Sequence, residues 1–380
     1  MFSYHLQYIF IVLMFLGCGS KSKFEDDRSI VSAGNNNILA DSLFSVIKEI
    51  QLETISSSII SFPYLLYKHQ DNLIISSRGM ELKVFSVNGK YIKNIGRLGD
   101  GPGEYRDIST CFNIDGENFG VFDPKNKRVT IFNSDGVLFN TYKFNIYDTY
   151  AIQSIVHCQN KYYIHSKSYW KGHPELVYET DSVFNIIRGF ISADEKYYGY
   201  FYRNLIEGHL IFDDQRLCLY EVNSMAFRLN IIDPFSSKVD FIEISSPSFF
   251  KQLTPLPKIS SSEFSVGEYR KATHPFKLFV IGNRYLIIQY LSNIYSNKFH
   301  AEVARFDYFI LDLEKRLYVF ASGGLHNPTY GDGTNLYNVM YNRKEDKNDD
   351  ESFVRNPKIL IYQFNKRYFE QLTKHLTNNY

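Results

Sequence analysis

The residues best suited to chemistry gather in one stretch of ten, Gly96–Tyr105, with the sequence GRLGDGPGEY. Its four glycines and one proline exclude a helix interior or a central strand, because glycine loses backbone entropy there and proline lacks an N–H donor. Arg97, Asp100 and Glu104 add charged side chains. Such a loop could cradle a phosphate, contact another ligand, or form a tight corner between strands.

This loop departs from the phosphate-binding patterns. It has no Gly-Lys-Ser/Thr ending, and a strand is expected after it, whereas dinucleotide and P-loop sites need a strand–turn–helix. Two interpretations remain open. In the structural one, which we favour, the glycines allow a close crossing of the chain and Arg97 pairs with Glu104. In the functional one, Arg97, Asp100 or Glu104 contacts a ligand at the rim of a central channel.

Other candidates for a site are scattered. His157, His165 and His173 are eight residues apart, but strand alternation and intervening turns favour surface or core positions over one metal site. Asp332 could bind calcium through its carboxylate, yet a single loop does not supply the six to eight oxygen ligands that calcium takes. No Gly-x-Ser-x-Gly, His-Glu-x-x-His or paired-carboxylate motif occurs, so the sequence predicts no catalytic residue, no cofactor and no metal ligand.

The cysteines indicate one modification and no redox chemistry. Cys111, Cys158 and Cys218 are scattered without a Cys-x-x-Cys pair, which favours buried free thiols over a zinc site or a disulfide framework. Cys18 differs, because it follows an apolar run, Ile9–Leu16, in a segment with no charged residue up to Gly17. That run is too short to span a bilayer but suits a signal peptide.

The chain therefore divides into four parts. Residues 1–17 are expected to be a signal peptide, and residues 18–40 a flexible tether that is poor in large apolar residues. Residues 41–364 form the folded domain. In residues 365–380, Tyr368, Phe369, Leu372 and Leu376 have helical spacing, which predicts a short helix with Asn365 as a possible N-cap.

Composition limits the partners. The 380 residues include 30 Tyr and 32 Phe, and such a high aromatic content favours strands. The formal net charge of +1 lacks the basic footprint of a nucleic-acid-binding protein. We expect no nucleic acid partner.

Repetition of strands predicts the fold. Hairpin turns at Asn88-Gly89, Asp135-Gly136 and Asp181-Ser182 recur with a period of about 46 residues, each between strand-like runs, and this is typical of propeller blades. Three looser units follow, the fifth with an insertion between its first two recognised strands. The sixth unit lacks a last strand, which Val46–Leu52 can supply by closing the ring. We predict an all-β, six-bladed β-propeller of four-stranded antiparallel blades.

The glycine-rich loop and the N-terminus also carry a resemblance. Residues 95–105 resemble a loop of six-bladed β-propeller lipoproteins of Bacteroidetes, which are similar to NHL-repeat proteins, and residues 356–362 look like their final inner strand. The signature loop residues are Gly96, Arg97, Gly99, Gly101, Pro102, Gly103, Glu104 and Tyr105. Gly17-Cys18 resembles a lipobox, and this implies acylation of Cys18. The acidic residues near Glu25 resemble a signal for surface export.

Two classes of function follow. The first is an exported outer-membrane lipoprotein, periplasmic or surface-exposed, that is anchored by lipid and binds a glycan, peptide or protein partner. The alternative is a metal-dependent hydrolase or lyase, resembling lactonases or peptide-amidating lyases, with calcium or another divalent metal in the central channel. It requires three or four Asp, Glu, Asn or His side chains that converge there. The sequence does not indicate an oligomeric state.

Overall fold

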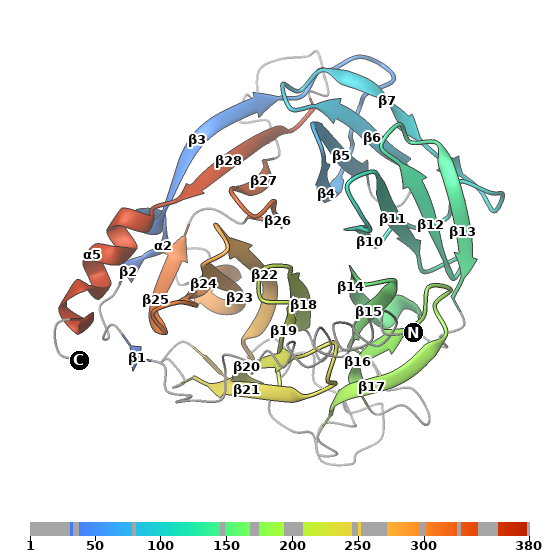
Figure 1. Cartoon of the computed structure of the whole chain (residues 1–380). Coiled ribbons are helices and arrows are strands. Elements are labelled where there is room, and N and C mark those ends of the chain that lie inside the picture. Colours follow the sequence, from blue (N-terminus) through green and yellow to red (C-terminus); the bar gives the residue numbers. More distant parts are fainter. Residues whose placement is uncertain are drawn as a thin grey trace, which may run out of the picture.

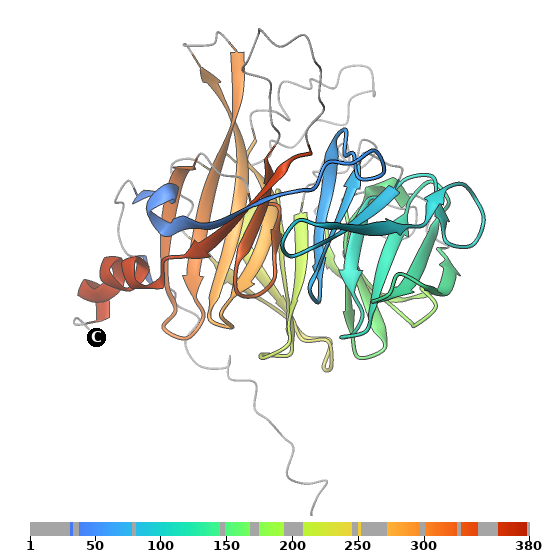
Figure 2. The same ribbon diagram turned by 90° about the horizontal axis from the view of Figure 1, so that it is seen from above.

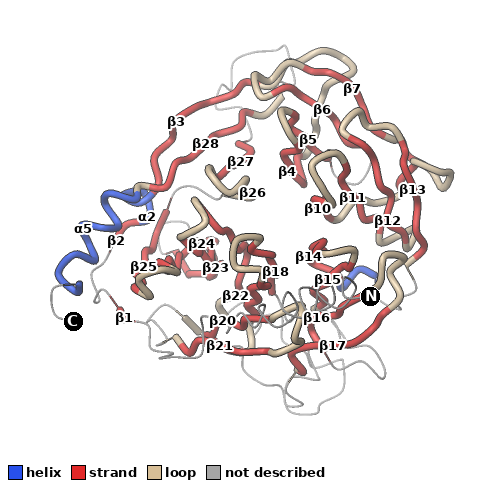
Figure 3. The backbone as a smooth tube through the Cα atoms, viewed as in Figure 1, coloured by secondary structure: helices blue, strands red, loops and turns tan. Residues whose placement is uncertain are grey.

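The structure is a computed structural model that describes residues 31–32, 38–77, 81–144, 149–167, 175–193, 208–244, 250–251, 272–296, 301–324, 328–340 and 356–377. Six sheets, each built on four antiparallel strands, radiate from a central axis as the blades of a propeller (Figure 1). The predicted fold class is therefore confirmed. Within these ranges helices are few and lie at the periphery, apart from the short η1 (Thr149–Ala151) (Figure 3).

The blades follow one another along the chain, and the strands of each blade run in order from the innermost to the outermost. Blade 1 contains β4 (Pro63–His69), β5 (Asn72–Ser77), β6 (Glu81–Ser86) and β7 (Tyr91–Ile95). Blade 2 contains β10 (Thr110–Asn113), β11 (Asn118–Asp123), β12 (Arg128–Asn133) and β13 (Leu138–Lys143). Blade 3 contains β14 (Ile152–Cys158), β15 (Lys161–Ser166), β16 (Glu175–Thr180) and β17 (Ile186–Ser192).

The second half of the ring has the same order. Blade 4 contains β18 (Gly208–Asp213), β19 (Cys218–Asn223), β20 (Ala226–Ile232) and β21 (Val239–Glu243). Blade 5 contains β22 (His274–Ile281), β23 (Tyr285–Ser296), β24 (Ala301–Asp312) and β25 (Leu317–Gly324). Blade 6 contains β26 (Tyr330–Gly331), β27 (Leu336–Met340), β28 (Lys358–Phe364) and β3 (Phe44–Gln51).

The two ends of the folded domain meet in blade 6. Strand β3 pairs antiparallel with β28, with Ile50 opposite Ile359, so the N-terminal strand completes the last blade as predicted. This pairing removes two open sheet edges. Strand β28 is the third strand of its blade and lies between β27 and β3, so residues 358–362 belong to an inner strand of the last blade, as the resemblance implied.

The segment before β3 is bound further upstream than expected. Strands β1 (Val31–Ser32) and β2 (Ile38–Leu39) add in parallel to the outer edge of β25, and the one-turn helix α2 (Ala40–Leu43) leads into β3. Ile38 and Leu43 are buried. Within the predicted tether, residues 31–32 and 38–39 therefore pair with blade 5 through their backbone, and the side chains of Ile38 and Ala40 are buried. The signal peptide and Cys18 lie outside the described residues.

Blade 5 is taller than the others. The expected insertion is instead a continuation of β23 and β24, whose ladder runs from Tyr285–Asp312 to Ser296–Ala301. The orange hairpin accordingly projects beyond one face of the ring (Figure 2). Of the predicted excursion over residues 247–275, most lies outside the described residues, and its last two residues begin β22.

Apolar side chains fill the spaces between blades. Between blades 1 and 2, for example, Ile95, Tyr105 and Phe119 are buried in one cluster. Helix α5 (Lys366–Thr377) packs on the periphery, where the Phe369 ring meets Tyr285 with centroids 5.3 Å apart. The Asn365 side chain accepts from the Tyr368 N–H at 3.0 Å, which is an N-cap at the predicted residue.

Candidate functional site

The glycine-rich loop links β7 of blade 1 to β10 of blade 2 and folds back on itself. Its strands β8 (Arg97–Leu98) and β9 (Glu104–Tyr105) pair in parallel. Arg97 Nε donates to Glu104 Oε1 at 2.6 Å, and the Gly101 N–H donates to Glu104 Oε2 at 2.7 Å. The predicted pair of Arg97 and Glu104 thus forms within the loop, and Glu104 is used internally.

The loop needs its glycines because side chains occupy the adjacent space. At Gly96, with φ of +70°, a Cβ would overlap the ring of Tyr105, which is fully buried between the blades. At Gly99 and Gly101 a Cβ would crowd the Glu104 carboxylate. These contacts agree with the structural interpretation, a close crossing of the chain between two blades.

Blade 2 holds the remaining polar groups of the loop. Arg128 donates to the backbone oxygens of Asp100, at 2.8 Å, and of Glu104. The Asp100 carboxylate pairs with Arg106. A Cβ at Gly103 would first meet Leu138 of the outermost strand β13, and Pro102 is in the turn before it. These contacts place the loop beside the outer strands of the blades, which favours the structural interpretation over a position at the rim of the central channel.

The histidines and Asp332, which the sequence does not favour as metal ligands, do not converge. His157 bonds the Ile114 carbonyl at 2.6 Å, His165 is buried elsewhere, and His173 lies outside the described residues. Asp332 accepts from Lys68 at 2.7 Å and from Tyr337 at 2.6 Å, so its oxygens are already occupied. Within the described ranges, no three His, Cys, Asp or Glu side chains are placed to hold a metal ion, and Cys111, Cys158 and Cys218 are free thiols.

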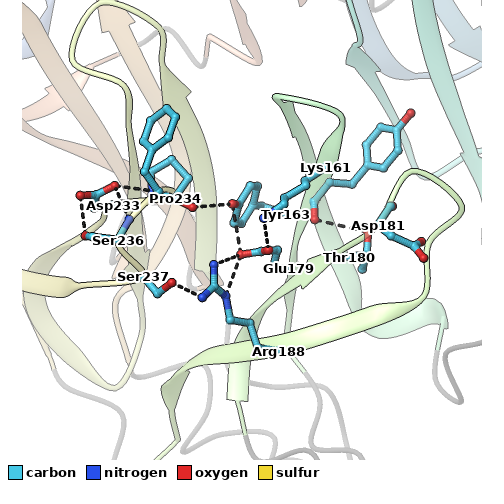
Figure 4. Close-up of polar contacts among 12 residues, drawn as sticks. Lys161, Tyr163, Glu179, Thr180, Asp181, Arg188, Asp233, Pro234, Ser236 and Ser237 are labelled. Carbon is cyan, nitrogen blue, oxygen red and sulfur yellow. Dashed lines mark hydrogen bonds and ion pairs between the residues drawn. The ribbon is translucent and has the colours of Figure 1, made fainter. Parts of the chain in front are cut away.

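A charged network joins blades 3 and 4. The buried Glu179 carboxylate pairs with Lys161 at 2.7 Å and with Arg188 at 2.6 Å (Figure 4). Arg188 also donates to Ser237, and Tyr163 to the Pro234 carbonyl at 3.4 Å, on the neighbouring blade (Figure 4). Burial alone would raise the pKa of Glu179, but the two cations outweigh it and hold that pKa below its ordinary value. The charges of this network are paired with one another, which indicates a structural role.

A second polar group lies nearer the axis, and we call His165, His209, Glu221 and Lys277 the inner cluster. His165 of β15 and Glu221 of β19 are both fully buried, and His165 Nε2 lies 3.1 Å from Glu221 Oε1 across the boundary of blades 3 and 4. An ionised carboxylate only accepts, so Nε2 carries the proton. Asn223 and Asn230 donate to the same carboxylate at 3.1 and 2.6 Å.

Glycine makes room for this pair on the innermost strand of blade 4. A Cβ at Gly208 would overlap the His165 imidazole, so the absence of a side chain lets the ring lie against the backbone of β18. The Gly208 N–H donates to Gln153 of β14 at 2.8 Å. These contacts join blades 3 and 4, and Lys277 on β22 adds blade 5, so the inner cluster includes residues of three successive blades.

His209 and Lys277 complete the inner cluster on adjacent innermost strands, β18 and β22. Both side chains are partly exposed. Burial is the main cause that holds the pKa of His209 well below its ordinary value, and the nearby Lys277 and His165 lower it further. This imidazole is therefore neutral at pH 7. Burial also lowers the pKa of Lys277.

Within the part of the chain that the structure describes, neither His209 nor Lys277 forms a hydrogen bond or an ion pair. Hydrogen-bonding groups that are partly exposed and have no protein partner can bind the polar atoms of a ligand. Sequence reasoning missed Glu221, His209 and Lys277. The one available signal was a carboxylate inside an apolar strand, Leu219-Tyr220-Glu221-Val222.

Comparisons with known proteins agree with the fold. A family model described as "Domain of unknown function (DUF4934)" matches residues 29–240. No curated protein matches the sequence. A solved structure of a candidate exported protein from Bacteroides fragilis is 14% identical, with a TM-score of 0.61, covering 88% of this chain and 99% of its own. A member of the DUF4221 family from Bacteroides vulgatus is 10% identical, with a TM-score of 0.55, covering 85% and 98%.

These two likenesses show a shared propeller fold in Bacteroides proteins. They leave the lipobox and the NHL-like character as predictions. No helix among the described residues is long and apolar enough to cross a membrane.

Proposed function

The chain belongs to the family described as "Domain of unknown function (DUF4934)", and from that premise we propose that it is an exported propeller that binds a ligand of the cell envelope. The observation that carries the proposal is the inner cluster. Its Lys277 and His209 are partly exposed on adjacent innermost strands and have no partner in the described residues. Polar groups taken from water without a partner cost free energy, and a ligand that bonds them recovers it.

The location is proposed on separate grounds. The apolar run Ile9–Leu16 and Gly17-Cys18 support export followed by acylation of Cys18, with the propeller at the outer membrane in the periplasm or at the surface. Strand β1 begins at Val31, which is 13 positions after Cys18. At about 3.5 Å per residue this tether reaches at most about 45 Å from the lipid.

The alternative, a metal-dependent hydrolase or lyase, needs three or four ligating side chains at the axis. Among the described residues no three His, Cys, Asp or Glu side chains are placed to hold a metal ion, and no other observation favours this alternative over a binding module.

Two experiments test the proposal. Incorporation of labelled palmitate in a lipoprotein-processing bacterium is expected for the wild type and absent for Cys18→Ala. No incorporation in the wild type contradicts the anchor. For binding, envelope polysaccharides and peptides are added to the purified propeller. A ligand at 100 times its Kd should stabilise the fold by about 2.7 kcal/mol. If no compound in the panel raises Tm, binding of an envelope ligand is contradicted.

A further inference from the structure

The inner cluster contains a positive charge that has no counter-charge. The Lys277 ammonium has no acidic partner among the described residues. The buried carboxylates of blades 4 and 5 have partners of their own. Glu221 accepts from His165, Asn223 and Asn230, and the other three pair with arginines, Asp213 with Arg216, Asp307 with Arg305 and Asp312 with Arg284. A half-buried cation without a counter-charge is unfavourable, so an anion that reaches it gains more than it would at an exposed lysine.

Four nitrogens of the inner cluster have no hydrogen-bond partner among the described residues. They are Nδ1 of the fully buried His165, Nδ1 and Nε2 of His209, and Nζ of Lys277. Nδ1 of His209 is buried, so Nε2 is the nitrogen of this partly exposed ring that can meet a ligand. Lys277 and His165 are both close enough to His209 for their charges to influence its titration. A neutral imidazole can donate one hydrogen bond and a lysine up to three. Together, His209 and Lys277 can satisfy several oxygen atoms of one ligand group.

The strand that carries Lys277 is irregular at this point. The ladder between β22 and β23 shifts between Pro275 and Lys277, so Phe276 is the extra residue of a β-bulge. Bulges redirect side chains and are frequent beside functional sites. The partly exposed Phe276 ring has its centroid 5.8 Å from Lys277 Nζ. A cation and an aromatic ring are thus side by side.

We propose that Lys277 and His209 bind the oxyanion of a ligand, a carboxylate or a phosphate, with the apolar part of that ligand against Phe276. This inference rests on the proposed binding function and names the chemistry of its ligand. The Lys277 ammonium supplies the charge and His209 a neutral hydrogen bond. His165 is hydrogen-bonded to Glu221, and its ring packs against Gly208, the residue before His209 on β18. Charge-assisted bonds of this kind are stronger than neutral ones.

Calorimetric titration with benzoate, benzamide and phenyl phosphate tests the inference on the full propeller. Benzamide has the shape of benzoate without its charge. We expect the wild type to bind benzoate at least tenfold more tightly than benzamide, and Lys277→Met to lose at least tenfold in affinity for the anions. His209→Leu should lose several-fold. Whichever of benzoate and phenyl phosphate binds more tightly shows whether the site prefers a carboxylate or a phosphate.

The matched control is Lys68→Met. Lys68 also lies on an innermost strand, β4, but its ammonium is already paired with Asp332 at 2.7 Å. It should leave anion affinity unchanged. Urea unfolding checks that each variant is folded. Equal affinity of the wild type and Lys277→Met, equal binding of benzoate and benzamide, or no anion binding at all would overturn the inference. The palmitate and ligand-panel experiments remain separate from it, so the two proposals can fail independently.

Discussion

His165 Nε2 and Glu221 Oε1 lie 3.1 Å apart across the boundary between blades 3 and 4, and neither side chain reaches solvent. Two further donors, from Asn223 and Asn230, reach the same carboxylate. The pair therefore links blade 3 to blade 4, and the His165 ring also packs against Gly208 of β18, the innermost strand of blade 4. It also places a polar group deep between two sheets whose contact is mostly apolar.

Removing this carboxylate should be costly. Glu221→Ala leaves three buried donors without an acceptor, and we expect the free energy of unfolding to fall by about 3–5 kcal/mol. Urea denaturation measures this. Glu49→Ala is the control, since the Glu49 carboxylate is 57% exposed and its Lys358 partner lies 3.4 Å away, so the loss should stay below about 1 kcal/mol. A loss under about 1 kcal/mol for Glu221→Ala would contradict a stabilising role for the pair.

The glycine-rich loop gives a second prediction, a difference in stability between Gly96→Ala and Gly116→Ala. Gly96 has φ of +70° and faces the buried Tyr105 ring. Gly96→Ala should lower the free energy of unfolding by about 1–3 kcal/mol, because the backbone is strained and the ring must move. At Gly116 no atom lies within 4 Å of an added Cβ, and Gly116→Ala should be nearly neutral. Similar losses for both variants would show that the loop tolerates a side chain.

Much of the fold could be predicted because the two middle strands of the first four blades are largely buried on both faces. Residues 118–123 and 128–133 are almost entirely buried, so these two strands are mostly apolar runs on either side of a turn, and in the first three blades this pattern repeats about every 46 residues. The innermost strands gave no such signal. In β4 and β18, partly exposed residues alternate irregularly with buried ones, and bulges interrupt β14 and β22.

The inner cluster could not be predicted for a related reason. Its residues are separated by up to 112 positions, from His165 to Lys277, and come from three blades. Only the closure of the ring brings them together. The Arg97–Glu104 pair was predictable because both residues belong to one short loop, where the turn itself sets the distance.

The N-terminal boundary of the propeller gives a third prediction. Strands β1 and β2 pair with β25, and Ile38 and Ala40 are buried. A chain that begins at residue 41 should therefore be less stable than one that begins at residue 31, by about 2 kcal/mol or more, because it loses a buried isoleucine and the edge pairing of blade 5. Thermal unfolding of the two truncated chains measures the difference. Equal Tm values for the two truncated chains would show that residues 31–40 add no stability and that the propeller begins at residue 41.

The Glu179 network predicts a dependence of stability on pH. The pKa of Glu179 in the folded chain is below its ordinary value, because Lys161 and Arg188 outweigh the effect of burial. A carboxyl group with a lowered folded pKa contributes stability above its unfolded pKa of about 4.3, and that contribution is lost as pH falls through the folded value. The unfolding free energy of Glu179→Gln should therefore be lower than that of the wild type by about 2 kcal/mol at pH 7.

This difference should narrow on acidification. As pH falls below the unfolded pKa of about 4.3, the contribution of the charge shrinks, and once pH passes through the lower folded pKa the wild-type carboxyl group is protonated and resembles the neutral amide of the variant, so the two curves converge. Glu117→Gln is the control, because Glu117 is exposed to solvent in the turn before β11, and its curve should follow the wild type at every pH. Urea denaturation between about pH 3 and 7 measures all three proteins. A constant difference between the wild type and Glu179→Gln across this range would mean that packing, and not the charge of Glu179, joins blades 3 and 4.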